Sequence, residues 1–284
     1  MSDCEKAMRA FGIDPASTQI LTQKAGITVA RATVDGKSVI CKHFASHDDR
    51  REIENYRLLA DLGVPTIRVL GTRADALLLE DIAESSVWRM GEESDMDDPA
   101  VAASLAAWYR ALHQRSAAYV KTAGAGLYDE SDCFTRENLT AIAAKTATQD
   151  AETWQLLTEH FDALAQKLRQ TPRTLTYNDF YHTNLVVSRD GERAMMFDYN
   201  LLGKGYAYAD LRNVTSSLSP RATEVFLAAY GAFDPAEAAL DDVVSPIVTL
   251  HYACRREHFP NWARSSLESV RTDLPAKIRA LLAR

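Results

Sequence analysis

The first third of the chain alternates between hydrophobic and polar residues, and this pattern predicts β-strands around one helix. Residues 27–34 and 38–44 alternate and are rich in β-branched side chains, as is usual for strands with one buried face. Asp35 and Gly36, which lie between them, are typical of a two-residue hairpin turn. A pair of antiparallel strands is therefore expected over residues 27–44.

The next segment changes to the helical period. Residues 46–63 carry apolar side chains at three-and-four spacing, Ser46 can cap the first turn, and Gly63 ends the pattern before Pro65. Residues 66–82 then form two short apolar runs separated by a polar turn, which indicates two further strands. The first third is thus expected to be a small sheet with one helix.

The rest of the chain follows a mainly helical pattern, and an acidic, sparsely apolar stretch at 91–100 separates it from the first third. Most later segments repeat apolar residues every three or four positions, as amphipathic helices do. Short apolar runs joined by the turn Arg189-Asp190-Gly191 indicate a central ribbon of strands. The expected helices are 101–114, 137–145, 151–170 and 221–231, with further helix through 241–259 to the end of the chain, and the expected strands are 174–177, 184–188 and 194–199.

Composition narrows the class of protein. The 284 residues are 46% hydrophobic and 25% charged, which is ordinary for a soluble globule with one large or two smaller domains. No stretch approaches the length of a membrane span, and the four cysteines form no paired motif, so we expect a cytoplasmic protein with reduced thiols and no membrane partner. The net charge of -7 disfavours a nucleic-acid partner, because clustered Lys and Arg bind phosphate backbones.

Lys42 is the first candidate for chemistry. Alternation places it on the same strand face as Ile40 and Phe44, and a buried ammonium group needs an anionic partner. Glu52, early in the following helix, is the nearest candidate, with Glu54 as the alternative. Protein-kinase-like folds use a strand lysine held by a helix glutamate to present a cation to nucleotide phosphates. A lysine that snorkels from an edge strand would give the same pattern.

Three polar residues further along the chain form a second candidate site. Asp179 and Asn184 have the D-x-x-x-x-N spacing of kinase catalytic loops, in which the carboxylate lies near the acceptor hydroxyl and the amide oxygen binds a metal. Asp198 follows an apolar strand, and oxygen ligands from two loops suit Mg²⁺. Each motif alone is weak, since Asp and Asn are common in turns. Their order after Lys42 and Glu52 is specific.

Together, these segments resemble the aminoglycoside phosphotransferase and choline kinase superfamily. Its catalytic segment runs close to H-G-D-x-x-x-x-N, followed by a hairpin and I-D-W or I-D-F, and the similar segments here are TYNDFYHTN and MFDYN. Further similar segments, in the same order as in the family, are REIENYRLLADLGVPTIRVLG, ALLLEDIAE, WYRALHQ, YADLRNV and VFLAAYG. The resemblance covers nearly the whole chain.

The resemblance implies an α+β, bilobal protein-kinase-like fold. Residues 1–83 would form a small β-rich, nucleotide-binding lobe with one key helix and the hinge. Residues 84–284 would form a larger helical lobe with the catalytic loop and the substrate site. The implied enzyme is an ATP-dependent O-phosphotransferase that uses an alcohol group of a small molecule as acceptor.

The same resemblance assigns the nucleotide contacts. Lys42 would hold α- and β-phosphate oxygens of ATP, and Glu52 would orient Lys42. The backbone of Glu80 and Ile82 would meet the adenine base at the hinge. GTP is an alternative nucleotide, because the hinge contacts would be made by backbone groups.

The resemblance also assigns the metal and the acceptor. Asn184 and Asp198 would hold Mg²⁺, and Asp179 would position or deprotonate the acceptor hydroxyl. Tyr177 and Asn178 stand where the family has His and Gly, and we expect both changes to be structural. The segment before the strand at 27–34 has a single glycine, so no glycine-rich phosphate clamp can be assigned to it.

The resemblance and the acidic composition together suggest the class of acceptor. We expect an aminoglycoside or related antibiotic, and the alternatives are a metabolic kinase for choline, ethanolamine, a sugar or an amino alcohol, and a kinase-like protein that binds without catalysis. The acidic run at 92–98 fits a polycationic ligand or a solvated linker. Tyr206, Tyr208, Tyr252 and Trp262 fit an ammonium cage or ordinary core packing.

Overall fold

The computed structural model describes residues 2–284 and shows a mixed α+β chain, which confirms the predicted fold class. The described chain forms two compact units. The predicted division into lobes at residues 83 and 84 follows a different criterion and stays a prediction. The first unit contains the described residues up to Ser116 together with Tyr177–Leu202 and Asn213–Gly231, and the second contains Ala117–Thr176, Gly203–Arg212 and Ala232–Arg284.

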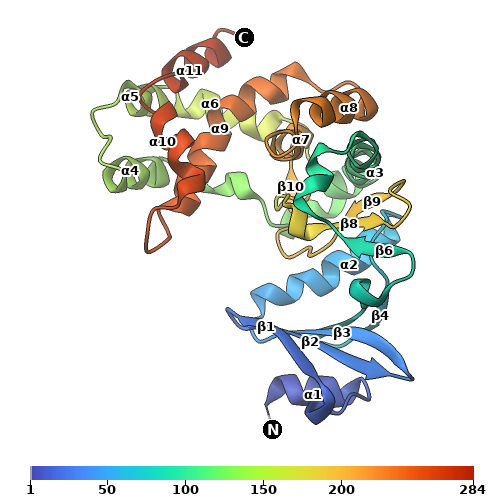
Figure 1. Cartoon of the computed structure of the whole chain (residues 1–284). Coiled ribbons are helices and arrows are strands. Elements are labelled where there is room, and N and C mark those ends of the chain that lie inside the picture. The colour runs from blue at the N-terminus through green and yellow to red at the C-terminus, as the bar shows by residue number, and fades with distance from the viewer. Residues whose placement is uncertain (1) are drawn as a thin grey trace. The chain divides into compact units, whose positions relative to one another are not determined.

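An antiparallel five-stranded sheet, with strand order β1-β2-β3-β5-β4, lies in the first unit (Figure 1). Asp35 (φ 50°) and Gly36 (φ 74°) form the predicted hairpin turn between β2 and β3. The four predicted strands are confirmed, but β1 was missed because all six of its residues are exposed and show no alternation. The strands are β1 (Gln19–Lys24), β2 (Ile27–Val34), β3 (Lys37–Phe44), β4 (Val69–Thr72) and β5 (Ala76–Glu80).

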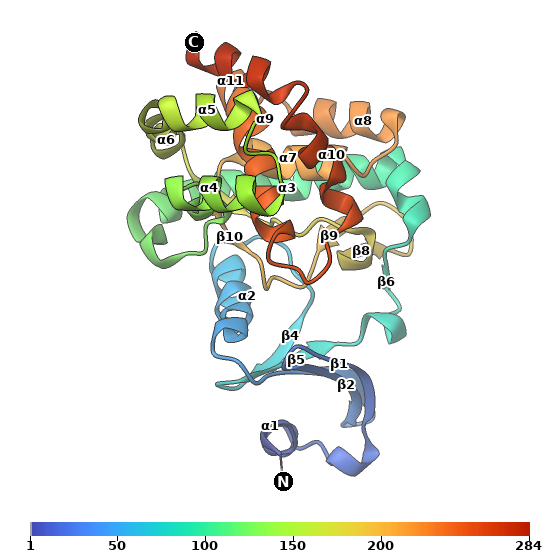
Figure 2. The same ribbon diagram turned by 90° about the vertical axis from the view of Figure 1, so that its left-hand side faces the viewer.

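Helices α1 (Asp3–Ala10) and α2 (Arg51–Asp61) cover opposite faces of this sheet (Figure 2). Met8 of α1 packs with Cys41 in a small apolar cluster on one face. Helix α1 was not predicted, although its start carries a capping box in which the Ser2 backbone N–H donates to Glu5 Oε2 (2.7 Å). The opposite face of the sheet, which α2 covers, carries the candidate active site described below.

The predicted helix at 46–63 is confirmed with a later start. Ser46 Oγ accepts a hydrogen bond from the Asp48 backbone N–H (3.2 Å), and a 3-10 turn (Asp48–Arg50) leads into α2. Gly63, with φ 68°, ends the helix as expected, because glycine easily adopts a left-handed backbone conformation. The first turn of α2 is therefore fixed close to the end of β3.

A second sheet of the first unit has the order β6-β8-β9. The ribbon of β8 and β9 was predicted, whereas β6 was not, because it is only three residues long. The predicted strand start at Asn184 is wrong by one residue, since Asn184 belongs to a 3-10 turn (His182–Asn184). The strands are β6 (Trp88–Met90), β8 (Leu185–Ser188) and β9 (Ala194–Met196).

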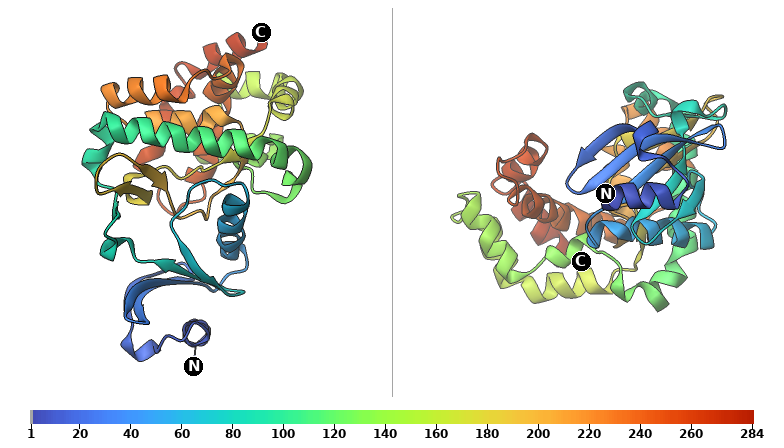
Figure 3. Two further views of the ribbon diagram at one scale, coloured as in Figure 1. Left: turned by 90° about the vertical axis from the view of Figure 1, so that its right-hand side faces the viewer. Right: turned by 90° about the horizontal axis from the view of Figure 1, so that it is seen from below.

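Helix α3 (Pro99–Ala123) is a single long helix and extends beyond the predicted 101–114 (Figure 3, left). Ser104 Oγ on this helix accepts a hydrogen bond from the Ala194 backbone N–H of β9 (2.7 Å). The bond ties α3 to the second sheet within the first unit.

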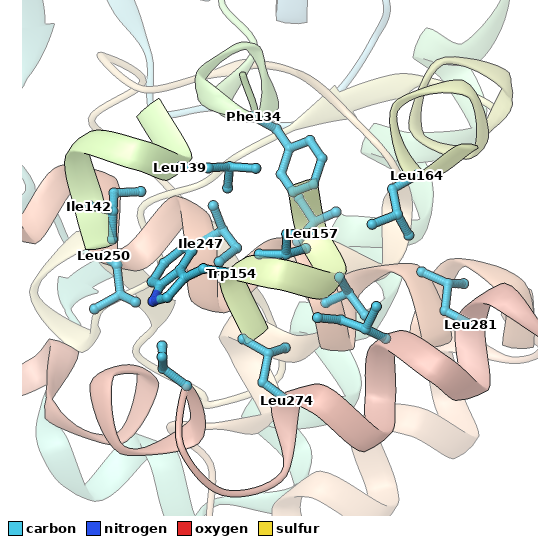
Figure 4. Close-up of a cluster of buried hydrophobic side chains, with 14 of the residues drawn as sticks. Phe134, Leu139, Ile142, Trp154, Leu157, Leu164, Ile247, Leu250, Leu274 and Leu281 are labelled. Carbon is cyan, nitrogen blue, oxygen red and sulfur yellow. The ribbon is translucent and has the colours of Figure 1, made fainter. Parts of the chain in front are cut away.

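The second unit is mainly helical and encloses one apolar core (Figure 4). The single helix predicted at 151–170 is wrong, because His160 leaves helical geometry (φ -103°, ψ 14°) and divides it. Trp154 before the break and Leu164 after it are buried in the same core. The helices that lie wholly in this unit are α4 (Arg136–Lys145), α5 (Glu152–Glu159), α6 (Phe161–Gln170), α9 (Pro235–Ala253), α10 (Arg264–Ser269) and α11 (Leu274–Leu282).

The predicted strand at 174–177 forms, but it does not join the ribbon. Strand β7 (Thr174–Thr176) pairs with β10 (Gly203–Gly205) instead of with β8 or β9. Two further helices are α7 (Ala207–Thr215) and α8 (Pro220–Tyr230). Across residues 2–284, no helix combines the length and the apolar character needed to cross a membrane.

Candidate active site

Lys42 is buried on β3 and makes two ion pairs within the first unit. Its Nζ lies 2.7 Å from Glu52 Oε2 on α2 and 2.9 Å from Asp198 Oδ1. Glu54 instead pairs with Arg57 on the exposed side of the helix (2.7 Å). Glu52 is therefore the partner of Lys42, and the alternatives of Glu54 and of a snorkelling lysine are excluded.

Burial and charge together determine the protonation of this cluster. Burial raises the pKa of Glu52 to about 7, although the Lys42 ammonium group acts against it. Burial lowers the pKa of Lys42, but the charges of Glu52 and Asp198 outweigh this and hold that pKa above its ordinary value. Lys42 therefore stays positively charged at neutral pH and is held between α2 and the loop that carries Asp198.

The backbone at Asp198 is held in an unusual conformation. Asp198 has φ 61°, in the left-handed region that costs a non-glycine residue about 1–2 kcal/mol. Two buried tyrosines fix the chain before it, since Tyr177 Oη donates to the Phe197 carbonyl (2.5 Å) and Tyr199 Oη donates to the Met196 carbonyl (2.5 Å). The strained turn at the end of β9 directs the Asp198 side chain toward Lys42.

The replacement of the family histidine by Tyr177 has a structural explanation. Tyr177 is fully buried, and its ring lies edge-on to Trp108 (5.9 Å) and to Tyr199 (6.0 Å). Its hydroxyl group holds the Phe197 carbonyl, next to Asp198. The aromatic cluster therefore packs against the loop that carries Asp198. Tyr177 thus has the structural role expected of the replacement.

Two residues of α2 that were not predicted bind the loop after Asp198. Asn55 Nδ2 donates to the Tyr199 carbonyl (2.7 Å), and Arg51 Nε donates to the Asn200 carbonyl (2.5 Å). Asn55 is buried, and it lies three positions after Glu52 on the same face of the helix. A polar residue on the buried face of α2 was the sequence signal that could have identified it.

Asp179 and Asn184 contact each other directly. Asn184 Nδ2 donates to Asp179 Oδ2 (3.0 Å) and to the Asp179 carbonyl (3.1 Å), which points the amide oxygen of Asn184 away from Asp179. Burial, and then the negative charge of Asp198, raise the pKa of Asp179, while the hydrogen bond from Asn184 lowers it. Asn178, with φ 66°, turns the chain immediately before Asp179.

A cleft of about 370 Å³ lies between the sheet and the loop that carries Asp198. Lys42, Glu52 and Asp198 line it, and so do Glu80 and Ile82, the residues predicted to meet adenine. Most of its other walls are apolar, which suits a flat aromatic base. The apolar residues at these walls include Leu21, Val29, Ile40, Leu79 and Met90.

The hinge residues have defined backbone contacts. The Glu80 backbone N–H donates to the Arg68 carbonyl (3.0 Å), and Glu80 Oε1 accepts from the Arg68 backbone N–H (2.8 Å). Ile82 begins a 3-10 turn (Ile82–Glu84) and is buried. Both residues reach the cleft, so the structure brings the predicted base contacts and the Lys42 cluster to the same cavity.

The segment before β2, to which no glycine-rich phosphate clamp could be assigned, forms a tight turn. Ala25 (φ 50°) and Gly26 (φ 83°) connect β1 and β2, and Lys24 pairs directly with Ile27 across the turn. The Gly26 carbonyl accepts a hydrogen bond from the Ala45 backbone N–H (2.9 Å). A short hairpin anchored to the end of β3 therefore takes the place of a long glycine loop.

This fold and this arrangement of residues define a protein-kinase-like phosphotransferase for small molecules. A buried strand lysine is paired with a helix glutamate, an aspartate follows a strand, and an Asp–Asn loop lies beside it. The chain belongs to the phosphotransferase enzyme family (APH), a model of which matches residues 26–241.

Solved structures of similar fold include antibiotic phosphotransferases and choline kinases. The macrolide 2′-phosphotransferase MphH from Brachybacterium faecium is 18% identical, with 94% of this chain and 97% of that chain covered and a TM-score of 0.60. The choline kinase LicA from Streptococcus pneumoniae is 14% identical, with coverage of 99% and 98% and a TM-score of 0.62. The spectinomycin phosphotransferase APH(9)-Ia is 14% identical, with 96% of this chain and 94% of that chain covered and a TM-score of 0.54.

These likenesses confirm the predicted kinase-like fold, and the family model confirms the predicted superfamily. Because all three identities are below one fifth, they show the fold and leave the substrate open. A search of curated protein sequences gave no match at a significant level.

Gly91 packs against the loop that carries Asn184. A Cβ at Gly91 would lie 2.6 Å from the His182 carbonyl oxygen and 2.6 Å from Leu185 Cβ. Because overpacking forces the backbone to shift, we expect Gly91→Ala to lower the free energy of unfolding by about 1–3 kcal/mol and to lower activity. Chemical denaturation and turnover assays measure both effects.

Gly126→Ala is the matched control for this substitution. Nothing lies within 4 Å of a Cβ at Gly126, and its φ is not positive, so the added methyl group meets open space. Its unfolding free energy and activity are expected to match the wild type. Equal unfolding free energies in the two variants and the wild type would contradict the packing argument at Gly91.

Proposed function

We propose that this protein transfers the γ-phosphate of ATP to a hydroxyl group of a small molecule, with Mg²⁺ as cofactor. The observation that carries the proposal is the contact network of Lys42 with Glu52 and Asp198, beside the paired Asp179 and Asn184. All five residues belong to the same compact unit. The arrangement gives one cation for phosphates, two oxygen ligands for a metal and one carboxylate for the acceptor.

The nucleotide would occupy the cleft of the first unit. Its adenine base would lie among the apolar walls near Glu80 and Ile82, and its α- and β-phosphates would contact the Lys42 ammonium group. Glu52 would keep Lys42 in place, because the pair is buried and its two charged atoms lie 2.7 Å apart. GTP could bind in the same way wherever base recognition uses backbone groups, so both nucleotides belong in the assay.

The donor set at Asp198 and Asn184 fits a magnesium ion. Asp198 Oδ1 contacts Lys42, which leaves Oδ2 as a carboxylate ligand, and the amide oxygen of Asn184 points away from Asp179. Hard oxygen ligands from two loops are the usual protein share of a Mg²⁺ shell. When bound, the ion would neutralise charge on the phosphate oxygens.

Asp179 would act on the acceptor. Its carboxylate is fixed by Asn184 Nδ2 at 3.0 Å, so it can accept a hydrogen bond from the acceptor hydroxyl. It can then take up the hydroxyl proton as the new P–O bond forms and the bond from the γ-phosphorus to the bridging oxygen breaks, with ADP as the leaving group. The transition state of phosphoryl transfer is mostly loose, so positioning and charge neutralisation supply most of the acceleration. The residues of this chain provide both.

For the acceptor, we propose an aminoglycoside or related antibiotic. This choice is supported by the family and by the fold likeness to MphH and APH(9)-Ia, which are described as acting on a macrolide and on spectinomycin. The likeness to LicA, described as a choline kinase, makes choline or a related amino alcohol the second candidate.

Some residues of the two sequence features that could have favoured either acceptor have structural roles. Within the acidic run, Asp95 pairs with Arg89 (2.6 Å), and Asp98 Oδ1 accepts from the Ala100 backbone N–H at the start of α3 (2.7 Å). Among the aromatic residues, Tyr206 is buried, donates to Asp241 (2.9 Å) and already has the Arg173 guanidinium over its ring (5.7 Å). Neither feature therefore decides between an antibiotic and choline.

Expression in a susceptible bacterium tests the choice of acceptor. Inhibitory concentrations are measured over a panel of aminoglycosides, macrolides and peptide antibiotics, with the Asp179→Asn variant as the inactive control. The purified protein is then assayed for ATP and GTP turnover with each antibiotic and with choline, ethanolamine and sugars. The proposal is supported if the wild-type protein protects the bacterium against an antibiotic and the Asp179→Asn variant does not.

Two other outcomes would change the proposal. Turnover with choline, ethanolamine or a sugar, without protection against any antibiotic, would replace the antibiotic acceptor by a metabolic one. Failure to bind or consume either nucleotide with every acceptor would overturn the kinase activity itself.

A further inference from the structure

Asp81 is a buried carboxylate at the hinge end of the cleft. It follows β5 directly and accepts hydrogen bonds from Arg31 Nε of β2 (2.6 Å) and Ser38 Oγ of β3 (2.7 Å). Its other oxygen accepts from the Ala83 backbone N–H (3.1 Å), inside the 3-10 turn of the hinge. One side chain thus joins two strands of the sheet to the hinge backbone.

Strand register places this cluster relative to Lys42. On neighbouring strands, Arg31 lies opposite Ile40, and Val29 lies opposite Lys42. Side chains two residues apart share a strand face, so Arg31 lies about 7 Å along the cleft from the position opposite Lys42. Lys42 and Arg31 both line the cleft, but Lys42 binds Glu52 and Asp198 whereas Arg31 binds the hinge carboxylate.

The Asp81 carboxylate is held in its charged form. Burial would raise its pKa, but the hydrogen bonds from Arg31 and Ser38 outweigh burial and lower the pKa below its ordinary value. Charge-assisted hydrogen bonds are short and directional, and here they converge from three chain segments. The backbone of residues 81–83 is therefore held in one conformation.

We propose that Arg31, Asp81 and Ser38 form a positioning cluster that holds the hinge backbone ready for the purine base and so sets nucleotide affinity rather than the rate of transfer. The inference rests on the proposed function, because it takes the cleft to be the nucleotide site. A binding loop fixed beforehand loses less entropy when the ligand arrives, which raises affinity. The residues act through the hinge and are not catalytic.

A second ion pair in the same unit provides a matched control. Arg89 and Asp95 approach to 2.6 Å, with 31% and 5% of their side-chain surfaces exposed, against 31% and 3% for Arg31 and Asp81. Asp95 also accepts from a backbone N–H, that of Glu92 (2.8 Å). The described lining of the cleft includes neither Arg89 nor Asp95. Arg89 also donates to the carbonyl of Met90, a residue of the cleft lining (3.1 Å), but only the Arg31–Asp81 pair binds the hinge backbone.

The test compares Asp81→Asn with Asp95→Asn. Both variants lose a buried charge pair and are expected to unfold at similar, lowered temperatures. Calorimetric titration with ADP and MgCl₂ is expected to show about tenfold weaker binding for Asp81→Asn, the scale of one lost charged hydrogen bond, and wild-type binding for Asp95→Asn. With an acceptor found by the panel, Asp81→Asn should raise KM for ATP about tenfold and leave kcat and KM for the acceptor within about twofold.

Ser38 supplies a milder pair of variants in case Asp81→Asn folds poorly. Ser38→Ala removes one hydrogen bond to Asp81 and is expected to weaken ADP binding about threefold, whereas Ser38→Thr keeps the hydroxyl group and should bind ADP as the wild type does.

Wild-type ADP affinity in both Asp81→Asn and Ser38→Ala would overturn the inference while the proposed function stands. Equal loss of affinity in Asp81→Asn and Asp95→Asn would also overturn it, because the effect would then be general destabilisation. Absence of ADP binding in the wild type would overturn the proposed function itself.

Discussion

Replacement of Asp179 by alanine is expected to remove phosphoryl transfer while ATP still binds. Asp179 lies beside Asn184 and does not line the nucleotide cleft, so its loss leaves the contacts of Lys42 and the hinge in place. A positioned carboxylate that handles the acceptor proton typically contributes a factor of about 10² to 10⁴ in rate. Turnover with a panel acceptor and calorimetric ATP binding measure the two halves of this expectation.

A second substitution separates the charge of Asp179 from its shape. Asp179→Asn keeps a side-chain oxygen that can accept from Asn184 Nδ2, so the loop is expected to stay in place while the proton acceptor is lost. Asp190→Asn, in the exposed hairpin turn of the same ribbon, changes the same charge away from the site and should retain full activity. Wild-type turnover in Asp179→Ala would contradict the proposed mechanism.

The sequence predicted the residues of the site better than their supports. The order of Lys42, Glu52, Asp179, Asn184 and Asp198 was readable because each belongs to a short local motif. The structure brings these residues together as the motifs implied. Their roles in binding and transfer stay predictions until the variants are measured.

The choice between Glu52 and Glu54 could have been made from helix geometry. Two positions apart on a helix, the two side chains point to nearly opposite sides, because each residue advances the helix by about 100°. Glu52 shares its face with the buried Tyr56, whereas Glu54 faces Arg57 at the surface. The position of the apolar face of α2 therefore identifies Glu52 as the residue that can reach Lys42.

Contacts between distant segments could not have been predicted from local patterns. The hydrogen bonds that join Arg31 and Ser38 to Asp81 connect residues 50 and 43 positions apart. Strand β7 has two β-branched threonines that favour a strand, yet its partner β10 consists of Gly203, Lys204 and Gly205, which carry no strand signal. Pairing of this kind depends on the assembled fold, so local periodicity does not show it.

Loss of the Lys42 charge is expected to have the second largest effect. Lys42→Met removes the phosphate contact and should lower kcat/KM for ATP by about 10² to 10³, the usual cost of one charge-stabilising donor in a closed site. It also leaves Glu52 fully buried without its cation. Removal of one partner from a buried pair typically costs about 3–5 kcal/mol of folding free energy.

The stability of Lys42→Met should depend on pH in a defined direction. Burial already raises the pKa of Glu52 to about 7, and loss of Lys42 removes a cation that holds it down. The folded variant then binds the Glu52 proton more tightly than the unfolded chain does, so its stability should fall as pH rises from about 5 to about 8. Lys37→Met, on the exposed end of β3, should show no such loss.

The double variant Lys42→Met/Glu52→Gln tests whether the two residues act as one unit. Glutamine carries no charge, so the double variant has no unpaired buried carboxylate and should regain most of the stability that Lys42→Met loses at pH 8. Its kcat/KM for ATP should remain as low as that of Lys42→Met, because the phosphate contact is still absent. Chemical denaturation at pH 6 and pH 8 measures the first expectation. Additive losses of stability from the two substitutions would show that Glu52 and Lys42 do not depend on each other.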